Sequence, residues 1–151
     1  METSESILAA HPFFKDLAPR HLKLLAECAS QVSFPAGGYL FRENEEASRF
    51  YVIYHGRVAH EVFTGARGPI TIRTVEAGEV LGWLWFGKPY HWRFETRALE
   101  LTRALALDVR QVAQRCEQDH ELGYTLLKAY SHMLAVHYRV AFLQLLDIYG
   151  P

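Results

Sequence analysis

Hydrophobic and polar positions follow two different periods along the 151 residues of the chain. In residues 32–107, apolar and β-branched residues come in short runs that glycine, proline and charged turns interrupt. Beyond Asp108, apolar residues recur every three or four positions. The first pattern is typical of short strands and the second of amphipathic helices. The chain is therefore predicted to hold a β-rich middle part with helices on both sides.

The middle part is predicted to form an antiparallel sheet structure. Two runs, 50–54 and 58–63, are separated only by a short turn around Gly56, which indicates a hairpin. Short strands at roughly ten-residue spacing are typical of a sandwich or barrel. The predicted strands are 32–34, 39–41, 50–54, 58–63, 70–73 and 102–107.

The N-terminal part, residues 3–31, has a helical pattern that Pro12 interrupts. Its second helix is predicted to leave His21 in solvent and to bury one face, formed by Leu24, Leu25 and Cys28. At the other side of the sheet, Asp108 is placed to cap a helix over 109–117, because its carboxylate can accept bonds from the first free N–H groups.

The segment 121–149 carries the strongest helical signal of the chain, and its apolar arc is wide. One stripe is expected to pack on the sheet and another to pair with a second copy, although a single wide buried face within a monomer is the alternative. His137 lies near the middle of the arc, where it sets helix register or is a hydrogen-bonded core histidine. The candidate pairing positions are Leu127, Tyr130, Leu134, His137, Tyr138, Ala141, Leu145 and Ile148.

Composition narrows the class of protein. The formal net charge of -1 provides no general attraction to nucleic acid. The two cysteines are far apart in sequence, which predicts reduced thiols. The sequence shows no signal peptide and no apolar run of bilayer length, so we expect a cytoplasmic protein without membrane contact. We expect a single domain over 1–151, with helices in 1–31, a β-roll in 32–107 and helices in 109–149.

Four segments together resemble the cyclic-nucleotide-binding domain family of catabolite-activator and FNR type. These are 34–44 at the β-roll opening, 50–58 at the hairpin, 77–82 at the entry to the phosphate-binding cassette and 104–108 at the exit strand. The resemblance implies a jelly-roll-like antiparallel β-roll with N-terminal helices and a long C-terminal helix. Since no helix-turn-helix segment follows that helix before Pro151, direct DNA binding by this chain is not expected.

The resemblance also implies a ligand pocket, and the sequence departs from the family there. Where the family has a ribose-binding Glu after Gly82, this chain has Trp83, which cannot accept a hydrogen bond. The family's phosphate-binding Arg falls on Trp92, with Arg93 one residue away and so on the opposite face of a strand. The candidate pocket residues are Gly78, Glu79, Leu81, Gly82, Trp83, Leu84, Trp85, Trp92, Arg93 and Thr96.

Three interpretations of the aromatic residues in 83–94 stay open: a pocket refilled by rings, a pocket for a flatter or more apolar ligand, and an exposed patch that docks a partner. Lys88, Arg93 and Arg97 remain candidates for holding an anion. No spacing indicates a metal or haem site: His132 and His137 are five apart, and adjacent His60 and Glu61 point to opposite faces of a strand.

No nucleophile motif or carboxylate pair indicates an enzyme. We expect a stand-alone regulatory or sensor module with a divergent cassette, which forms a homodimer and acts through an unidentified partner protein. One alternative is a genuine cyclic AMP or cyclic GMP binding protein that uses Arg93. The other is a docking protein with a filled pocket. The sequence assigns no cofactor, and a cyclic nucleotide or another small ligand is the candidate for one.

Overall fold

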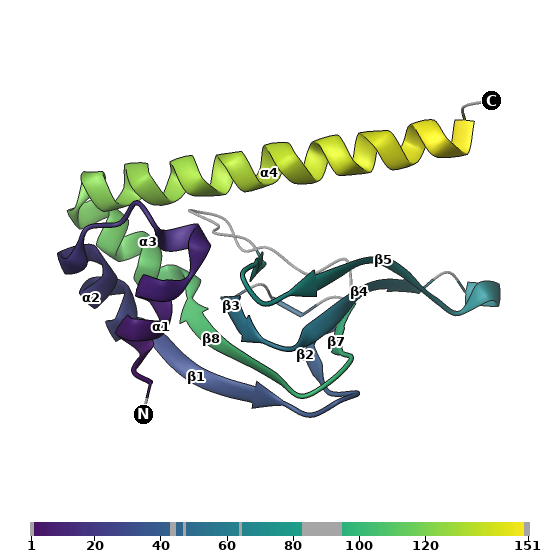
Figure 1. Cartoon of the computed structure of the whole chain (residues 1–151), viewed down its shortest axis with the longest axis horizontal. Helices are drawn as coiled ribbons and strands as arrows, with labels where there is room; N and C mark the ends of the chain where they lie inside the picture. The colour runs from purple at the N-terminus through teal and green to yellow at the C-terminus, as the bar shows by residue number, and fades with distance from the viewer. Residues whose placement is uncertain (1, 43–44, 47, 64, 83–94, 150–151) are drawn as a thin grey trace.

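The computed structural model describes residues 2–42, 45–46, 48–63, 65–82 and 95–149. Helices gather at the two ends of the chain and strands fill the middle (Figure 1). The helical elements are α1 (Ser4–Ala10), η1 (Pro12–Phe14), α2 (Pro19–Glu27), η2 (Gly65–Arg67), α3 (Val109–Gln118) and α4 (His120–Tyr149). The strands are β1 (Ala29–Phe34), β2 (Tyr39–Phe41), β3 (Arg49–His55), β4 (Arg57–Phe63), β5 (Pro69–Glu76), β6 (Val80–Leu81), β7 (Glu95–Ala98) and β8 (Thr102–Asp108).

These strands form two antiparallel sheets of four strands each, in the orders β1-β8-β3-β6 and β2-β7-β4-β5. The chain crosses between the sheets several times, which gives the predicted jelly-roll-like β-roll. Helices α1, α2 and α3 lie at one end of the roll, and α4 runs along the length of the molecule on one side (Figure 1).

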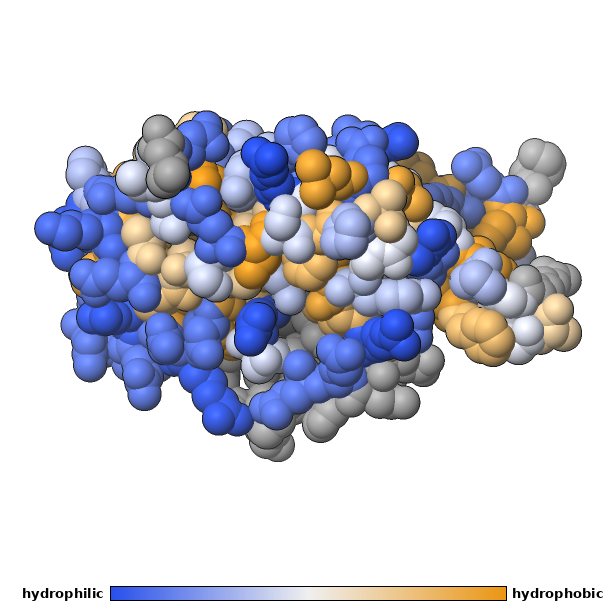
Figure 2. All heavy atoms as spheres, turned by 90° about the horizontal axis from the view of Figure 1, so that it is seen from below, coloured by the Kyte–Doolittle hydropathy of each residue, from blue (hydrophilic) through white to orange (hydrophobic). Residues whose placement is uncertain are grey.

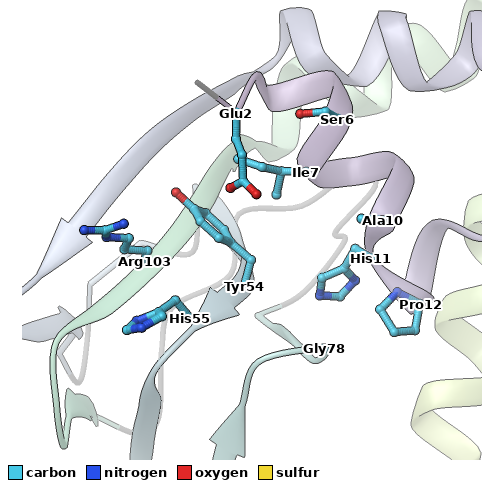
Figure 3. A pocket seen from close by; sticks show the side chains of 10 residues that line it. All are labelled: Glu2, Ser6, Ile7, Ala10, His11, Pro12, Tyr54, His55, Gly78 and Arg103. Carbon is cyan, nitrogen blue, oxygen red and sulfur yellow. The ribbon is translucent and has the colours of Figure 1, made fainter.

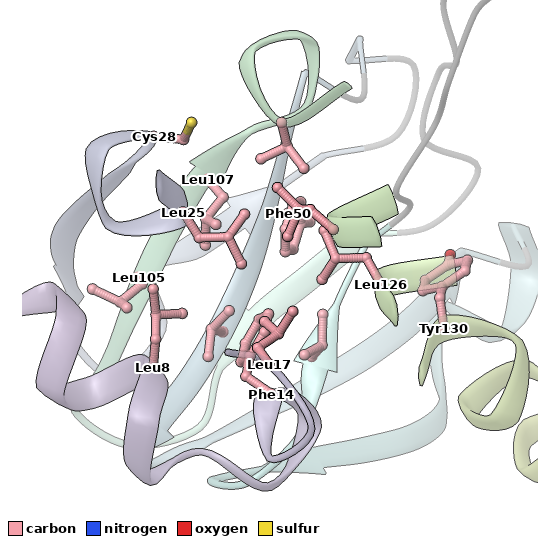
Figure 4. Close-up of a cluster of buried hydrophobic side chains, with 14 of the residues drawn as sticks. Leu8, Phe14, Leu17, Leu25, Cys28, Phe50, Leu105, Leu107, Leu126 and Tyr130 are labelled. Carbon is pink, nitrogen blue, oxygen red and sulfur yellow. The ribbon is translucent and has the colours of Figure 1, made fainter. Parts of the chain in front are cut away.

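Two hydrophobic clusters hold these layers together. The larger one lies between the first sheet and the helices, and Figure 4 shows Leu8, Phe14, Leu25 and Phe50 converging there. The second cluster lies between the two sheets and includes Ile53. Burying a side chain of this size contributes about 1.5–3 kcal/mol. The helices are therefore fixed to the roll by the same kind of burial that closes the roll itself.

The six predicted strands are confirmed, but the predicted hairpin and the N-terminal boundary are wrong. The runs 50–54 and 58–63 do follow each other through a turn at Gly56, but β3 pairs with β6 and β8 in the first sheet and β4 pairs with β5 and β7 in the second. β1 begins at Ala29 rather than Val32, because Ala29, Ser30 and Gln31 pair with Leu107, Ala106 and Leu105 of β8. The short strands β6 and β7 were not predicted. The placement of His21 in solvent is also wrong: its side chain is 1% exposed and bonds to Asp119 at 3.0 Å.

Gly56 makes the tight turn between β3 and β4. Its φ of 96° lies in the left-handed region, and a Cβ there would lie 2.5 Å from the Leu101 carbonyl oxygen. A residue with a side chain would therefore be strained twice, by its backbone angle and by this contact.

The predicted cap of α3 is confirmed, since the Asp108 carboxylate accepts from the Gln111 N–H at 3.0 Å. The long C-terminal helix is also confirmed, starting one residue earlier than predicted. Within the described part of the chain, no helix combines the length and the apolar character needed to cross a membrane.

Candidate functional site

Three polar side chains lie in line across the second sheet. His60 of β4 is paired in register with Arg73 of β5 on one side and with Thr96 of β7 on the other. Directly opposed residues of antiparallel strands point to the same face of a sheet. Arg73, His60 and Thr96 therefore form one row, which we call the polar row.

The face that carries the polar row is the inner one. Two residues along, the corresponding row consists of Val75, Val58 and Ala98, all 0% exposed and all within the cluster between the sheets. Side chains two apart on a strand share a face. The inner face thus changes from apolar to polar over one step, and polar groups on such a face need hydrogen-bond partners or a ligand.

Helix α4 contacts one end of the polar row. The Arg73 guanidinium contacts the two ring nitrogens of His137 at 3.1 and 3.0 Å. It also donates to the Glu79 carboxylate at 2.7 Å, which accepts from the Glu76 N–H at 3.1 Å as well. Only a neutral imidazole can accept a hydrogen bond from a guanidinium. The sheet, the β5–β6 turn and α4 are therefore joined through one arginine.

Both histidines of this site are held in the neutral form. Burial, with Arg73 and His137 nearby, lowers the pKa of His60 to about 4. Burial and Arg73 also lower the pKa of His137, while Glu79 acts in the opposite direction. Neutral imidazoles both donate and accept hydrogen bonds, so the site suits a polar ligand with groups of both kinds.

The Thr96 hydroxyl adds an unmet hydrogen bond. Thr96 is 0% exposed, and its Oγ1 has no partner among the described residues. A buried hydroxyl without a partner costs about 1–3 kcal/mol. A ligand that bonded to Thr96 would recover this cost.

A second contact ties α4 to the start of the predicted cassette. The Tyr130 hydroxyl donates to the Gly82 carbonyl at 3.2 Å. Of the predicted pocket residues, Glu79 and Thr96 belong to the site described here. Gly78 lies in the β5–β6 turn, and Leu81 is buried in β6 within the cluster between the sheets. The others, Trp83, Leu84, Trp85, Trp92 and Arg93, lie outside the described residues, as does Lys88.

Arg97, a candidate anion ligand from the sequence, is on the outer face. It pairs in register with Ala59, whose side chain points away from the Val58 face. Its guanidinium binds both oxygens of Glu61, at 3.1 and 3.2 Å. Arg97 is therefore not part of the site. Arg73 and His60 were missed as ligand candidates, although both lie in predicted strands, 70–73 and 58–63.

The predicted pairing stripe of α4 contains both buried and exposed residues. Tyr130 is buried against the body, which corrects its assignment to the pairing face, and His137 is half-buried against Arg73. The remaining stripe is exposed, including Tyr138 at 72% and Ile148 at 71%. Between Leu134 and Tyr149 only Arg139 and Asp147 carry charge. Figure 2 shows apolar residues at the right-hand end, where α4 ends and the β4–β5 hairpin lies.

A separate polar cluster joins α2 to the α3–α4 junction. Arg20 donates to Asp119 at 2.6 Å and to Glu121 at 2.7 Å. Partial burial opposes ionisation of Asp119, but hydrogen bonds from Arg20, the Leu122 N–H and His21 lower its pKa to about 2. The donor atoms of His21, Asp119 and Glu121 are close enough to share a metal ion. However, Arg20 already forms an ion pair with each of the two carboxylates, so we interpret the cluster as an ion-pair network.

A cavity of about 380 Å³ lies between α1 and the strands β3 and β8. Figure 3 shows Glu2, Ser6 and Ile7 on the helical side, with Tyr54 and Arg103 on the strand side. The buried ring of His11 also lines it, but both of its nitrogens are in use: Nε2 donates to the Ile53 carbonyl and Nδ1 accepts from the Phe13 N–H. His11 therefore fixes the α1–η1 corner rather than serving a ligand.

Comparisons with known proteins point to one family. The model of the cyclic nucleotide-binding domain family matches residues 31–119. A comparison with curated proteins gives no match.

Three solved structures illustrate the likeness in fold. One is a cyclic nucleotide-binding domain from Methylobacillus flagellatus KT (TM-score 0.80, 19% identity, covering 95% of this chain and 81% of that one). Another is the N-terminal domain of a transcriptional regulator from Streptomyces coelicolor A3(2) (TM-score 0.72, 23% identity, 89% and 94% covered). A third is the Thermus thermophilus catabolite activator protein (TM-score 0.73, 21% identity, 92% and 63% covered). At these identities the likeness establishes the fold alone.

Proposed function

Because the chain belongs to the cyclic nucleotide-binding domain family, we propose that it is a regulatory domain that senses a small polar ligand between the polar row and α4. Members of this family are regulatory binding modules and generally not enzymes, and we propose no catalytic activity here. One observation carries the proposal: the polar row faces inward and is joined to α4 by the Arg73–His137 contact. A ligand at the row would therefore act directly on the helix.

A cyclic nucleotide is the first ligand to test. Arg73, His60 and Thr96 offer a cation, an imidazole and a hydroxyl, which suit the edge of a heteroaromatic base or an anionic group. Trp83 stands where the family's ribose-binding Glu is expected, so we propose that the cassette is divergent and that affinity depends more on the polar row than in a typical member.

The test is calorimetry with cyclic AMP and cyclic GMP on the wild type and three variants. We expect Arg73→Met to weaken binding about tenfold or more, because it removes a charge-assisted bond. The control Arg57→Met removes an exposed arginine, 50% exposed and 3.8 Å from Glu100, and is expected to change nothing. No heat at millimolar concentration of either nucleotide would exclude nucleotide sensing.

Arg93→Ala distinguishes the alternative in which a genuine cyclic nucleotide site uses Arg93. Binding that is abolished by Arg93→Ala and unaffected by Arg73→Met would favour it. The docking protein with a filled pocket predicts that no small molecule shifts the melting temperature, and that Trp85→Ala weakens capture of its partner protein.

We further propose that the domain forms a homodimer through the exposed stripe of α4 and acts on a partner protein. The support is the exposure of the stripe beyond Leu134: half-exposed leucine, valine and aromatic side chains there gain about 25 cal/mol for each Å² of apolar surface that a second helix covers. Sedimentation that shows a monomer at all concentrations would contradict the dimer. The cytoplasmic location stays a prediction from the sequence.

A further inference from the structure

We propose that a second cavity, between η1 and the first half of α4, binds a small apolar carboxylate. The cavity has a volume of about 690 Å³, which lies within the range of about 300–1,000 Å³ usual for small-molecule sites. This site goes beyond the proposed sensing function, and it does not depend on it.

The α4 wall of this cavity is built from two neighbouring stripes of the helix. Thr125, Ala129, Met133 and His137 follow one another at four-residue spacing and are all half-buried. Tyr124, Lys128, His132 and Val136 form the next stripe and are all exposed. Residues four apart lie on one face of a helix. The first stripe therefore forms the floor of the cavity and the second its rim.

The opposite wall is apolar in its depth and charged at its mouth. Phe13 is half-buried, and Val80 is buried at the far end. Lys15 and Asp16 are exposed and lie where the chain leaves η1. An occupant would thus meet Phe13, Val80, Ala129 and Met133 inside and charged groups outside, which is the usual division of a ligand site.

The charges at the mouth favour an anion. Two lysines, Lys15 and Lys128, and two carboxylates, Asp16 and Glu79, line the cavity. Glu79 is already neutralised by Arg73 at 2.7 Å. Neither lysine forms an ion pair with any residue that the structure describes. The two lysines and Asp16 together leave a net charge of one positive unit at the mouth, which matches a monocarboxylate with an apolar body.

This cavity is distinct from the space beside the polar row. It shares Glu79 and His137 with the candidate site, whereas Arg73, His60 and Thr96 do not line it. Arg73 contacts both shared residues without lining the cavity, so it lies between the cavity and the rest of the polar row. A variant in each space can distinguish which one a ligand occupies.

Calorimetry tests the proposal with octanoate and octylammonium below their micelle concentrations and with octan-1-ol below its solubility limit. We expect octanoate to bind most tightly and octylammonium least. Reversing one rim charge with Lys128→Glu should weaken octanoate binding about three- to tenfold, as for other exposed charge pairs. The control Lys23→Glu makes the same change of net charge on the exposed face of α2 and should have no effect.

Two more variants fix the location. Ala129→Trp fills the floor and should abolish octanoate binding; a circular dichroism spectrum and melting curve like those of the wild type show that it folds. Thr96→Val should leave octanoate binding unchanged. Three results would each overturn the proposal. They are an affinity for octylammonium as high as that for octanoate, equal effects of Lys128→Glu and Lys23→Glu on octanoate binding, and loss of octanoate binding in Thr96→Val.

Discussion

Replacing Thr96 with valine tests whether the polar row awaits a ligand. Valine has nearly the same shape as threonine, and both are β-branched residues that suit a strand. The change therefore removes the hydroxyl with little effect on packing. Since Oγ1 is buried without a partner among the described residues, we expect Thr96→Val to stabilise the unliganded protein by about 1 kcal/mol.

Thr102 provides a matched control. It is also 0% exposed, but its hydroxyl contacts the Glu100 carbonyl at 2.9 Å and the Arg57 carbonyl at 3.2 Å. Thr102→Val loses these bonds and should destabilise the protein by about 1–2 kcal/mol. The two substitutions are therefore expected to have opposite signs.

Urea unfolding measures the free energy of unfolding of both variants. A change in the urea midpoint at an unchanged slope m reports a change in stability. Calorimetry adds a second reading: a ligand that bonds to Thr96 should bind Thr96→Val up to about tenfold more weakly. A loss of stability in Thr96→Val as large as that in Thr102→Val would refute the reasoning, because it would mean that the Thr96 hydroxyl is already bonded in the unliganded protein.

Three other predictions concern the fold, the helix and pH. Gly56→Ala should cost about 3 kcal/mol or more in urea unfolding, because its Cβ would meet the Leu101 carbonyl at 2.5 Å at a φ of 96°; a loss under 1 kcal/mol would contradict the turn. Leu145→Glu should convert the dimer to monomer in sedimentation, while Leu101→Glu, at a leucine of similar exposure (46% against 52%), should not. The pKa of His60 is about 4 in the folded state and about 6.5 when unfolded, so the unfolded state binds the proton first and stability falls as pH drops through this window. Between about pH 7.5 and pH 5 His60 should contribute about 2 kcal/mol to the loss of stability, and His60→Gln should remove that contribution, while His11 and His137, whose pKa values burial also lowers, keep a smaller pH dependence. An unchanged dependence of stability on pH in His60→Gln would exclude His60 as a cause.

The strands were predictable because their signals are local. Glycine and proline turns separate runs of β-branched and aromatic residues, and the turn at Gly56 needs no distant partner. The same signals wrongly predicted a hairpin there, because only distant strands decide that β3 and β4 belong to different sheets. The boundary at Ala29 was not predictable from such signals. Residues 29–31 continue a short helical pattern, and only their pairing with 105–107 of β8 makes them a strand.

The candidate site depends on contacts between distant segments. His21 was expected in solvent because its partner, Asp119, is 98 residues away. The polar row needs the register of three strands, which the spacing of His60, Arg73 and Thr96 along the chain does not reveal. Likewise, the periodicity of α4 predicts apolar stripes, but where the body of the protein stops covering them is decided by tertiary packing.

The most direct test of ligand sensing at the polar row is a nuclear magnetic resonance titration with cyclic AMP and cyclic GMP, following the Thr96 methyl and the imidazole of His137. The account predicts that at least one nucleotide shifts both signals together, with a single dissociation constant. Saturable nucleotide binding that leaves both signals unchanged, or no response of either signal at millimolar nucleotide, would contradict it.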